Sequence, residues 1–159
     1  MIELGPTDFV PLEEFQRAWR FNDSRHNVLP SAALADIRPL TTTRAAALNG
    51  PLTTACAGCY ADPAKATNEV FSANSSTNEG VARTSRDLAL LPVADGERVV
   101  VSWDSVDAVE TSWYTFRTYW DDFCYPASDD VTISPLDGRW ILCYHHSERF
   151  SFGPTSPAA

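Results

Sequence analysis

The stretch DDVTISPLDGRWILCYHHSERFSFG, residues 129–153, has the alternating pattern of β-strands joined by tight turns. Asp137 and Gly138 supply a short turn, so the runs on either side of it are predicted to form a hairpin. Side chains alternate between the two faces of a strand. One face therefore takes Trp140, Leu142 and Tyr144, and the other takes Ile141, Cys143 and His145. A third strand through Phe150 and Phe152 would extend the pair into an antiparallel sheet.

The segment before this hairpin is predicted to contain one strand and one helix. ERVVVSWD, residues 97–104, is rich in β-branched residues and follows a turn signal at Asp95-Gly96, which favours a strand. Apolar residues then recur at alternating steps of three and four, as on one face of a helix. They are Val106, Val109, Trp113, Phe116, Trp120 and Phe123. We expect a helix that Asp104 or Ser105 caps and that ends at Phe123.

The N-terminal half predicts short helices followed by a loop-rich region. Residues 9–52 carry three helical patterns, with Pro11 in a first turn, Ser31 as a cap and Asn49-Gly50 as a stop signal. Residues 51–91 are rich in Ser, Thr and Asn, so we expect mobile loops there, with a short helix around residues 64–71. Residues 154–159 are expected to form a disordered tail. The predicted fold is a single α+β domain, residues 1–159, whose antiparallel sheet of about four strands is covered by helices.

Composition and charge restrict the classes of partner. The chain has 159 residues, of which 44% are hydrophobic, enough for one core. Its formal net charge of -9 repels nucleic acid and anionic membranes and attracts a basic protein. The first residues lack the pattern of a secretory signal, and no apolar run is long enough to span a bilayer, so a cytoplasmic location is expected.

WDDFCYPASDD, residues 120–130, holds two pairs of adjacent carboxylates, Asp121-Asp122 and Asp129-Asp130. A turn composition between the pairs would bring them close together. Four carboxylates could bind a hard cation, although the ligand spacing and the glycine of a calcium loop are missing. They could also form a solvated helix end and turn, or an acidic surface for a partner. All three interpretations remain open at this stage.

The histidines and cysteines offer further candidates. His145 and His146 are predicted to point to opposite faces of a strand, and His146 could act with Glu148 in acid-base chemistry or simply be hydrogen-bonded at the sheet edge. Cys56-Ala-Gly-Cys59 resembles half of a zinc or redox site, but a second close pair of ligands is absent from the sequence. We therefore expect no cofactor, and we expect Cys124 and Cys143 to be reduced, buried thiols.

Two motifs in the C-terminal third resemble a known pattern. FCYPASDD, residues 123–130, and YHHSERFSFG, residues 144–153, are similar to the Phe-Cys-Tyr-Pro-x-Ser-Asp-Asp and Tyr-x-His-x-Glu-x-Phe-x-Phe-Gly motifs of small bacterial proteins of the immunity-protein type, found in polymorphic toxin systems. EEFQRAWRF, residues 13–21, and LADIRPLTTTRAAAL, residues 34–48, are weaker matches at the N-terminus.

The resemblance implies a protein that binds and neutralises a cognate toxin, for example a basic nuclease, and it brings no catalytic residues. The residues expected to contact such a partner are Asp121, Asp122, Asp129, Asp130, His146 and Glu148. Two alternatives remain. One is a metal-assisted hydrolase that uses the same aspartates and His146, and the other is a housekeeping domain without a toxin partner.

Overall fold

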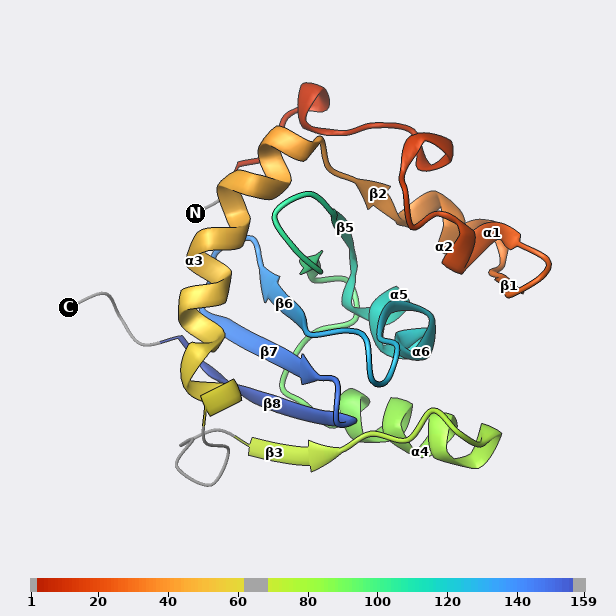
Figure 1. Ribbon diagram of the computed structural model, residues 1–159, viewed down its shortest axis with the longest axis vertical. Helices are drawn as coiled ribbons and strands as arrows, with labels where there is room; N and C mark the ends of the chain where they lie inside the picture. The colour runs from red at the N-terminus through yellow and green to blue at the C-terminus, as the bar shows by residue number, and fades with distance from the viewer. Residues whose placement is uncertain (1–2, 62–68, 156–159) are drawn as a thin grey trace.

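The computed structural model describes residues 3–61 and 69–155, with the backbone alone for residues 57–61. Within these ranges the fold is α+β, and seven strands form one antiparallel sheet (Figure 1). The strand order across the sheet is β2 (Arg38–Pro39), β5 (Ala108–Ser112), β4 (Arg98–Ser102), β6 (Val131–Pro135), β7 (Trp140–His145), β8 (Arg149–Pro154) and β3 (Glu69–Ser72). The class is confirmed, but about four strands was too few: β2 and β3 are short edge strands without a clear alternating pattern, and β5 was expected to be part of a helix.

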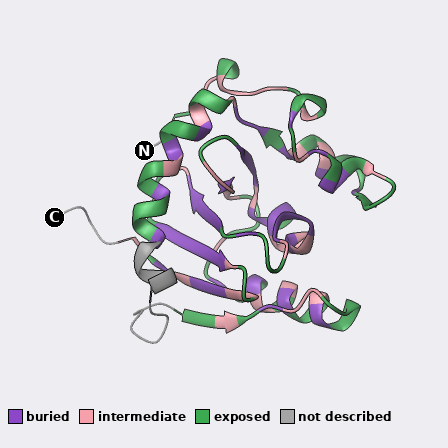
Figure 2. Ribbon diagram, viewed as in Figure 1, coloured by how far each residue is buried: buried purple, intermediate pink, exposed green. Residues whose placement is uncertain are grey.

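Helices cover both faces of the sheet. The long helix α3 (Thr42–Ala61) lies across one face, with the first 3-10 turn beside its start, and the other shorter helices lie on the opposite face (Figure 1). The shorter elements are η1 (Pro6–Asp8), η2 (Leu12–Glu14), α1 (Trp19–Asn22), β1 (Asn27–Val28), α2 (Ser31–Asp36), α4 (Asn78–Ala89), α5 (Trp113–Thr118) and α6 (Trp120–Phe123). The central strands are buried between these layers (Figure 2). None of the helices in the described ranges is both long and apolar enough to cross a bilayer.

The predicted C-terminal hairpin and its alternation are confirmed. Strands β6 and β7 pair antiparallel, and Gly138 in the turn adopts a positive φ of 68°, which glycine tolerates without strain. Trp140, Leu142 and Tyr144 belong to the larger hydrophobic core. Ile141 and Cys143 pack with α3 in a smaller core on the opposite face.

The predicted helix over residues 104–123 is wrong in its first half. Val109 lies in strand β5, which pairs with β4, and Val106 is exposed. Asp104 does not cap a helix. Its side chain instead accepts hydrogen bonds from the backbone N–H groups of Val106 (2.8 Å) and Asp107 (2.7 Å), which forms the turn between the two strands. Val106 and Val109 have the spacing of a helix in the sequence, but this segment pairs with β4 as a strand instead.

The second half of that prediction is confirmed. Helix α5 begins at Trp113, and the Ser112 side chain caps it by accepting a hydrogen bond from Thr115 N. The four apolar residues that follow at helical spacing, on α5 and α6, are fully buried in the larger core. They are Trp113, Phe116, Trp120 and Phe123.

The loop-rich prediction for residues 51–91 is also wrong. Helix α3 does not stop at Gly50 but continues to Ala61, and α4 occupies residues 78–89. The buried face of α4 consists of Gly80, Thr84 and Leu88, so two of its three members are not apolar residues and the helical pattern is hidden. Residues 69–71 belong to β3 rather than to a helix, and residues 62–68 lie outside the described ranges. At the C-terminus β8 includes Pro154, and residues 156–159 of the expected tail lie outside the described ranges as well.

A disulfide joins the long helix to the sheet. Cys56 of α3 is bonded to Cys143 of β7, with their Cα atoms 6.3 Å apart. The prediction of a Cys143 thiol is therefore wrong, because this side chain faces α3 and meets a cysteine 87 residues away in the sequence. Cys124 is a free, fully buried thiol, as expected, and burial raises its pKa well above the ordinary value.

Candidate partner-binding surface

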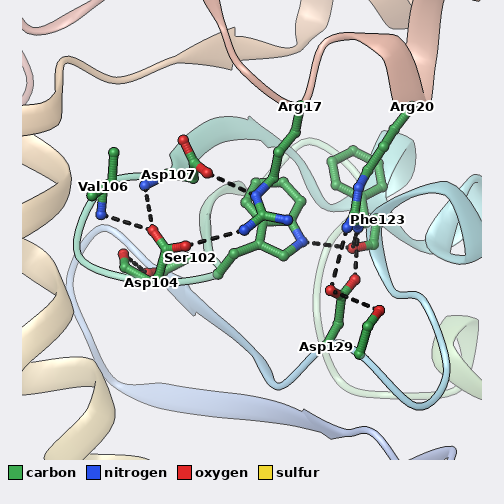
Figure 3. A network of polar contacts seen from close by, with 10 residues as sticks. Arg17, Arg20, Ser102, Asp104, Val106, Asp107, Phe123 and Asp129 are labelled. Atoms are coloured by element: carbon green, nitrogen blue, oxygen red, sulfur yellow. Dashed lines mark hydrogen bonds and ion pairs between the residues drawn. The ribbon is translucent and has the colours of Figure 1, made fainter.

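Asp129 stabilises the loop between α6 and β6 from inside the protein. Only 6% exposed, it accepts hydrogen bonds through Oδ2 from Arg20 Nη1 (2.6 Å) and from Tyr125 N (2.8 Å) (Figure 3). Arg20 is 3% exposed and also donates to the carbonyl oxygen of Phe123. A buried carboxylate already neutralised by a buried guanidinium is a structural group, so Asp129 does not contribute to a partner-binding surface.

Arg17, one helical turn before Arg20, makes a parallel connection. Its Nε donates to Asp107 Oδ2 (2.8 Å) and its Nη2 donates to Asp104 Oδ2 (3.1 Å), so it binds the turn between β4 and β5 (Figure 3). Between the two arginines lies the Trp103 indole, which donates to Phe123 O (2.8 Å). These contacts hold the N-terminal segment against the sheet. Arg17 and Arg20 are three residues apart in an acidic chain, and this spacing was the sequence signal for such ion pairs.

Asp121 and Asp122 form the second acidic pair, and the described part of the chain supplies no cation for them. Among the described residues, neither carboxylate forms an ion pair with an arginine or a histidine. Asp122 is 8% exposed and accepts hydrogen bonds from Asn27 Nδ2 (3.1 and 3.2 Å). Burial, together with the charge of Asp121, raises the pKa of Asp122 to about 6, and burial also raises the pKa of Asp121. Both shifts arise because the described residues around these carboxylates stabilise their charge less than water does.

Aromatic side chains adjoin this pair. Trp19 packs on His26 with ring centroids 4.5 Å apart and on Tyr125 at 5.8 Å, and it remains 36% exposed. His26 lies next to Asn27, which donates to Asp122. Burial is the main cause of the raised pKa of Tyr125, and the charges of Asp122 and Asp121 raise it further. We call Trp19, His26, Asp121, Asp122 and Tyr125 the acidic–aromatic surface.

Asp130 and the two adjacent histidines form a separate cluster. Asp130 Oδ1 accepts a hydrogen bond from His146 N (3.0 Å) and lies 2.9 Å from His146 Nδ1. The His145 and His146 rings do not point apart, as the strand prediction required, but lie with their centroids 4.0 Å apart. Strand β7 ends at His145, so His146 is already in the turn and the alternation no longer applies. Burial, and then the neighbouring His146, lower the pKa of His145.

The Glu148 side chain binds Ser75 and not His146, although its backbone N–H donates to His145 O (2.9 Å). Its side-chain Oε1 accepts hydrogen bonds from Ser75 Oγ (2.6 Å) and Ser75 N (3.2 Å), and its carbonyl oxygen accepts one from Ala73 N (2.9 Å). Glu148 therefore anchors the segment after β3. The acid-base pair of His146 and Glu148, one of the two alternatives considered from the sequence, is not formed, because the turn directs the two side chains to different partners.

The four aspartates thus occupy three different environments. Asp129 is neutralised inside the protein, Asp130 lies with the histidines, and Asp121 and Asp122 lie with the surface aromatics. A single four-carboxylate cation site is not formed. As for the Cys-x-x-Cys motif, Cys56 is in the disulfide, and the side chain of Cys59 lies outside the described residues.

No family model, no curated protein and no solved structure matches the chain. The resemblance to immunity proteins therefore stays a prediction from the two C-terminal motifs.

Proposed function

We propose that this protein binds and neutralises a cognate protein toxin through the acidic–aromatic surface. The observation that carries the proposal is the carboxylate pair Asp121 and Asp122, which is partly buried yet has no cationic partner among the described residues. A lysine or arginine of a basic partner would supply the missing charge, and its contact with the pair would be strengthened by the low exposure of Asp122.

The neighbouring aromatics suit the same role. Partly exposed Trp and Tyr side chains are enriched at protein–protein interfaces, where they bury large areas at low entropic cost. Trp19 and Tyr125 flank the carboxylates and are held by packing against each other and against Arg20, whose Cζ lies 4.0 Å from the Tyr125 ring centroid. A surface already rigid in the free protein loses less conformational entropy on binding. The net charge of -9 would add long-range attraction for a basic toxin.

The hydrolase alternative is less well supported. Its aspartates are separated, and only Asp130 contacts His146. A pocket of about 370 Å³ is lined by Val10, Phe15, Leu40, Asp107 and their neighbours, and none of the six predicted site residues is among them. Because the aspartates do not converge on one site, we propose a binding protein rather than an enzyme.

The disulfide bears on the proposed cytoplasmic location. Reducing systems keep cytosolic cysteines as thiols, so a protein that works in the cytoplasm would hold Cys56 and Cys143 in the reduced form. Rapid alkylation of thiols in lysed source cells, followed by mass spectrometry of the peptide that contains Cys143, tests this. A bonded Cys143 in freshly quenched cells would overturn the cytoplasmic location.

The binding proposal is tested with the partner, obtained by pull-down from the source cell or by co-expression with neighbouring open reading frames. The variant is Asp121→Asn with Asp122→Asn, and the matched control is Glu13→Gln with Glu14→Gln, which removes the same charge from an adjacent acidic pair that is exposed. We expect the association rate at low salt to fall about tenfold in the aspartate variant, and the loss to shrink as salt is added.

The control variant should lose much less, because it changes the net charge equally but leaves the surface intact. Equal losses in the two variants would mean that net charge alone attracts the partner. Unchanged rates in both would show that the acidic–aromatic surface is not the recognition site. Asp129 is left unchanged, since its loss would disturb the fold through Arg20.

A further inference from the structure

Asp130, His145 and His146 form a cluster of three side chains that can each ligate a metal ion. Each of the three side chains offers one ligand atom, and these atoms all lie within 4.8 Å of one another. His146 Nδ1 and Asp130 Oδ1 are 2.9 Å apart. Around an ion with tetrahedral bonds of about 2.0–2.2 Å, neighbouring ligand atoms lie about 3.3–3.6 Å apart. Side-chain rotations would bring all three ligand atoms to this spacing, and ligation through His145 Nδ1 would replace its contacts with Ser147 Oγ (2.6 Å) and Ser147 N (3.2 Å).

The backbone explains why these side chains meet. Residues 146–148 form a three-residue turn between β7 and β8, in which Glu148 takes a φ of 60°, and His145 pairs with Arg149 at the last rung of the ladder. Such a turn places His146 beside His145 instead of on the opposite face. The two histidines thus lie at the end of the paired β7–β8 hairpin, which limits their motion.

A second loop brings in the carboxylate. Ala127, with a φ of 66°, donates its N–H to the carbonyl oxygen of His146 (2.9 Å), and His146 N donates back to Asp130 Oδ1 (3.0 Å). These two hydrogen bonds join the loop that ends α6 to the β7–β8 turn. The backbone N–H of His146 also orients the Asp130 carboxylate, as groups around metal ligands commonly do.

The ligand set selects a class of ion. Two imidazoles with one carboxylate suit zinc and related divalent transition metals, whereas calcium and magnesium prefer oxygen ligands alone. The side chains of His146 and Asp130 are 50% and 49% exposed, so water or a group of another molecule could complete the coordination. Arg149 lies near His145 and its charge opposes a cation, which predicts a weaker site than a buried one.

We propose that Asp130, His145 and His146 bind one divalent transition-metal ion, of which zinc is the representative, at the tip of the β7–β8 hairpin. The proposal is independent of the toxin-binding function, because it uses none of the five residues of the acidic–aromatic surface. It also differs from the four-aspartate cation site considered from the sequence, since it needs one aspartate and both histidines.

The test is a zinc titration of the purified protein by isothermal calorimetry, in a Cys59→Ser background that removes a possible thiol ligand. We expect one ion per chain. His145→Ala, His146→Ala and Asp130→Asn should each weaken binding by at least about tenfold. The control is His26→Ala, which removes the third histidine of the chain, one that contacts Trp19 instead of this cluster, and should leave the affinity unchanged.

A second measurement locates the ion without relying on variants. In amide NMR spectra, zinc should shift the signals of residues 145–148 and of Asp130, and circular dichroism should show that each variant keeps the fold. The proposal is overturned if no saturable binding occurs below about 1 mM zinc, a concentration that corresponds to only about 4 kcal/mol of binding free energy. It is equally overturned if the histidine variants bind as wild type does, or if His26→Ala abolishes binding.

Discussion

Removal of the Arg20 guanidinium is expected to destabilise the protein strongly. In the variant Arg20→Met the Asp129 carboxylate would remain buried, at 6% exposure, without its cation. Breaking a buried ion pair from one side costs about 3–5 kcal/mol, because an uncompensated charge is left in a medium of low polarity. The substitution also removes the hydrogen bonds that Arg20 Nη1 donates to Asp129 Oδ2 and to Phe123 O, which connect α1 to the end of α6.

The assay is urea denaturation at pH 7, with the free energy of unfolding obtained by linear extrapolation. Asp129→Asn is the second single variant and Arg20→Met with Asp129→Asn is the double variant. The double variant should lose less than the sum of the two single losses, because neither charge is left alone. Arg25→Met serves as control, since its ion pair with Asp23 is at the surface and the denaturation midpoint should not move.

Two results would refute this reasoning. A loss below about 1 kcal/mol in Arg20→Met would show that Asp129 is solvated or neutralised in another way. Strictly additive losses in the double variant would show that Arg20 and Asp129 do not act as a pair.

Three further predictions concern the core, the disulfide and Asp122. Trp113→Ala should lower the free energy of unfolding by about 3–5 kcal/mol, since the side chain is fully buried, and a loss below about 1 kcal/mol would contradict its place in the core. Cys56→Ser should cost about 4–5 kcal/mol by the loop-entropy relation for cysteines 87 residues apart, and a reducing agent should lower the melting temperature of wild type but not of the variant. The pKa of Asp122 is raised to about 6 in the folded protein, from 3.8, so the folded state binds more protons between about pH 4 and pH 6. Stability should therefore fall as pH rises through that window, and Asp122→Asn should flatten this slope in denaturation curves; an unchanged slope would show that Asp122 titrates normally.

The local sequence pattern was sufficient to predict those elements whose structure depends on residues close by in the sequence. Alternation over residues 131–145 and the turn at Gly138 predicted the β6–β7 hairpin, and the helical spacing from Trp113 to Phe123 predicted a buried stripe. In such segments each side chain's environment depends on residues two to four positions away, so period and turn chemistry carry the information. The acidic pair Asp121-Asp122 was identified for the same reason, as a local concentration of charge.

The tertiary structure alone decided what each candidate group does. Asp129 is neutralised by Arg20, 109 residues away, and Cys143 is bonded to Cys56, 87 residues away. A turn, not a strand face, brought His145 and His146 together beside Asp130. Whether a carboxylate is buried and paired, or exposed and available, depends on contacts between distant segments, which periodicity does not encode. The sequence therefore determined where the charges and aromatics are concentrated, and the fold determined which of them are buried and paired inside the protein.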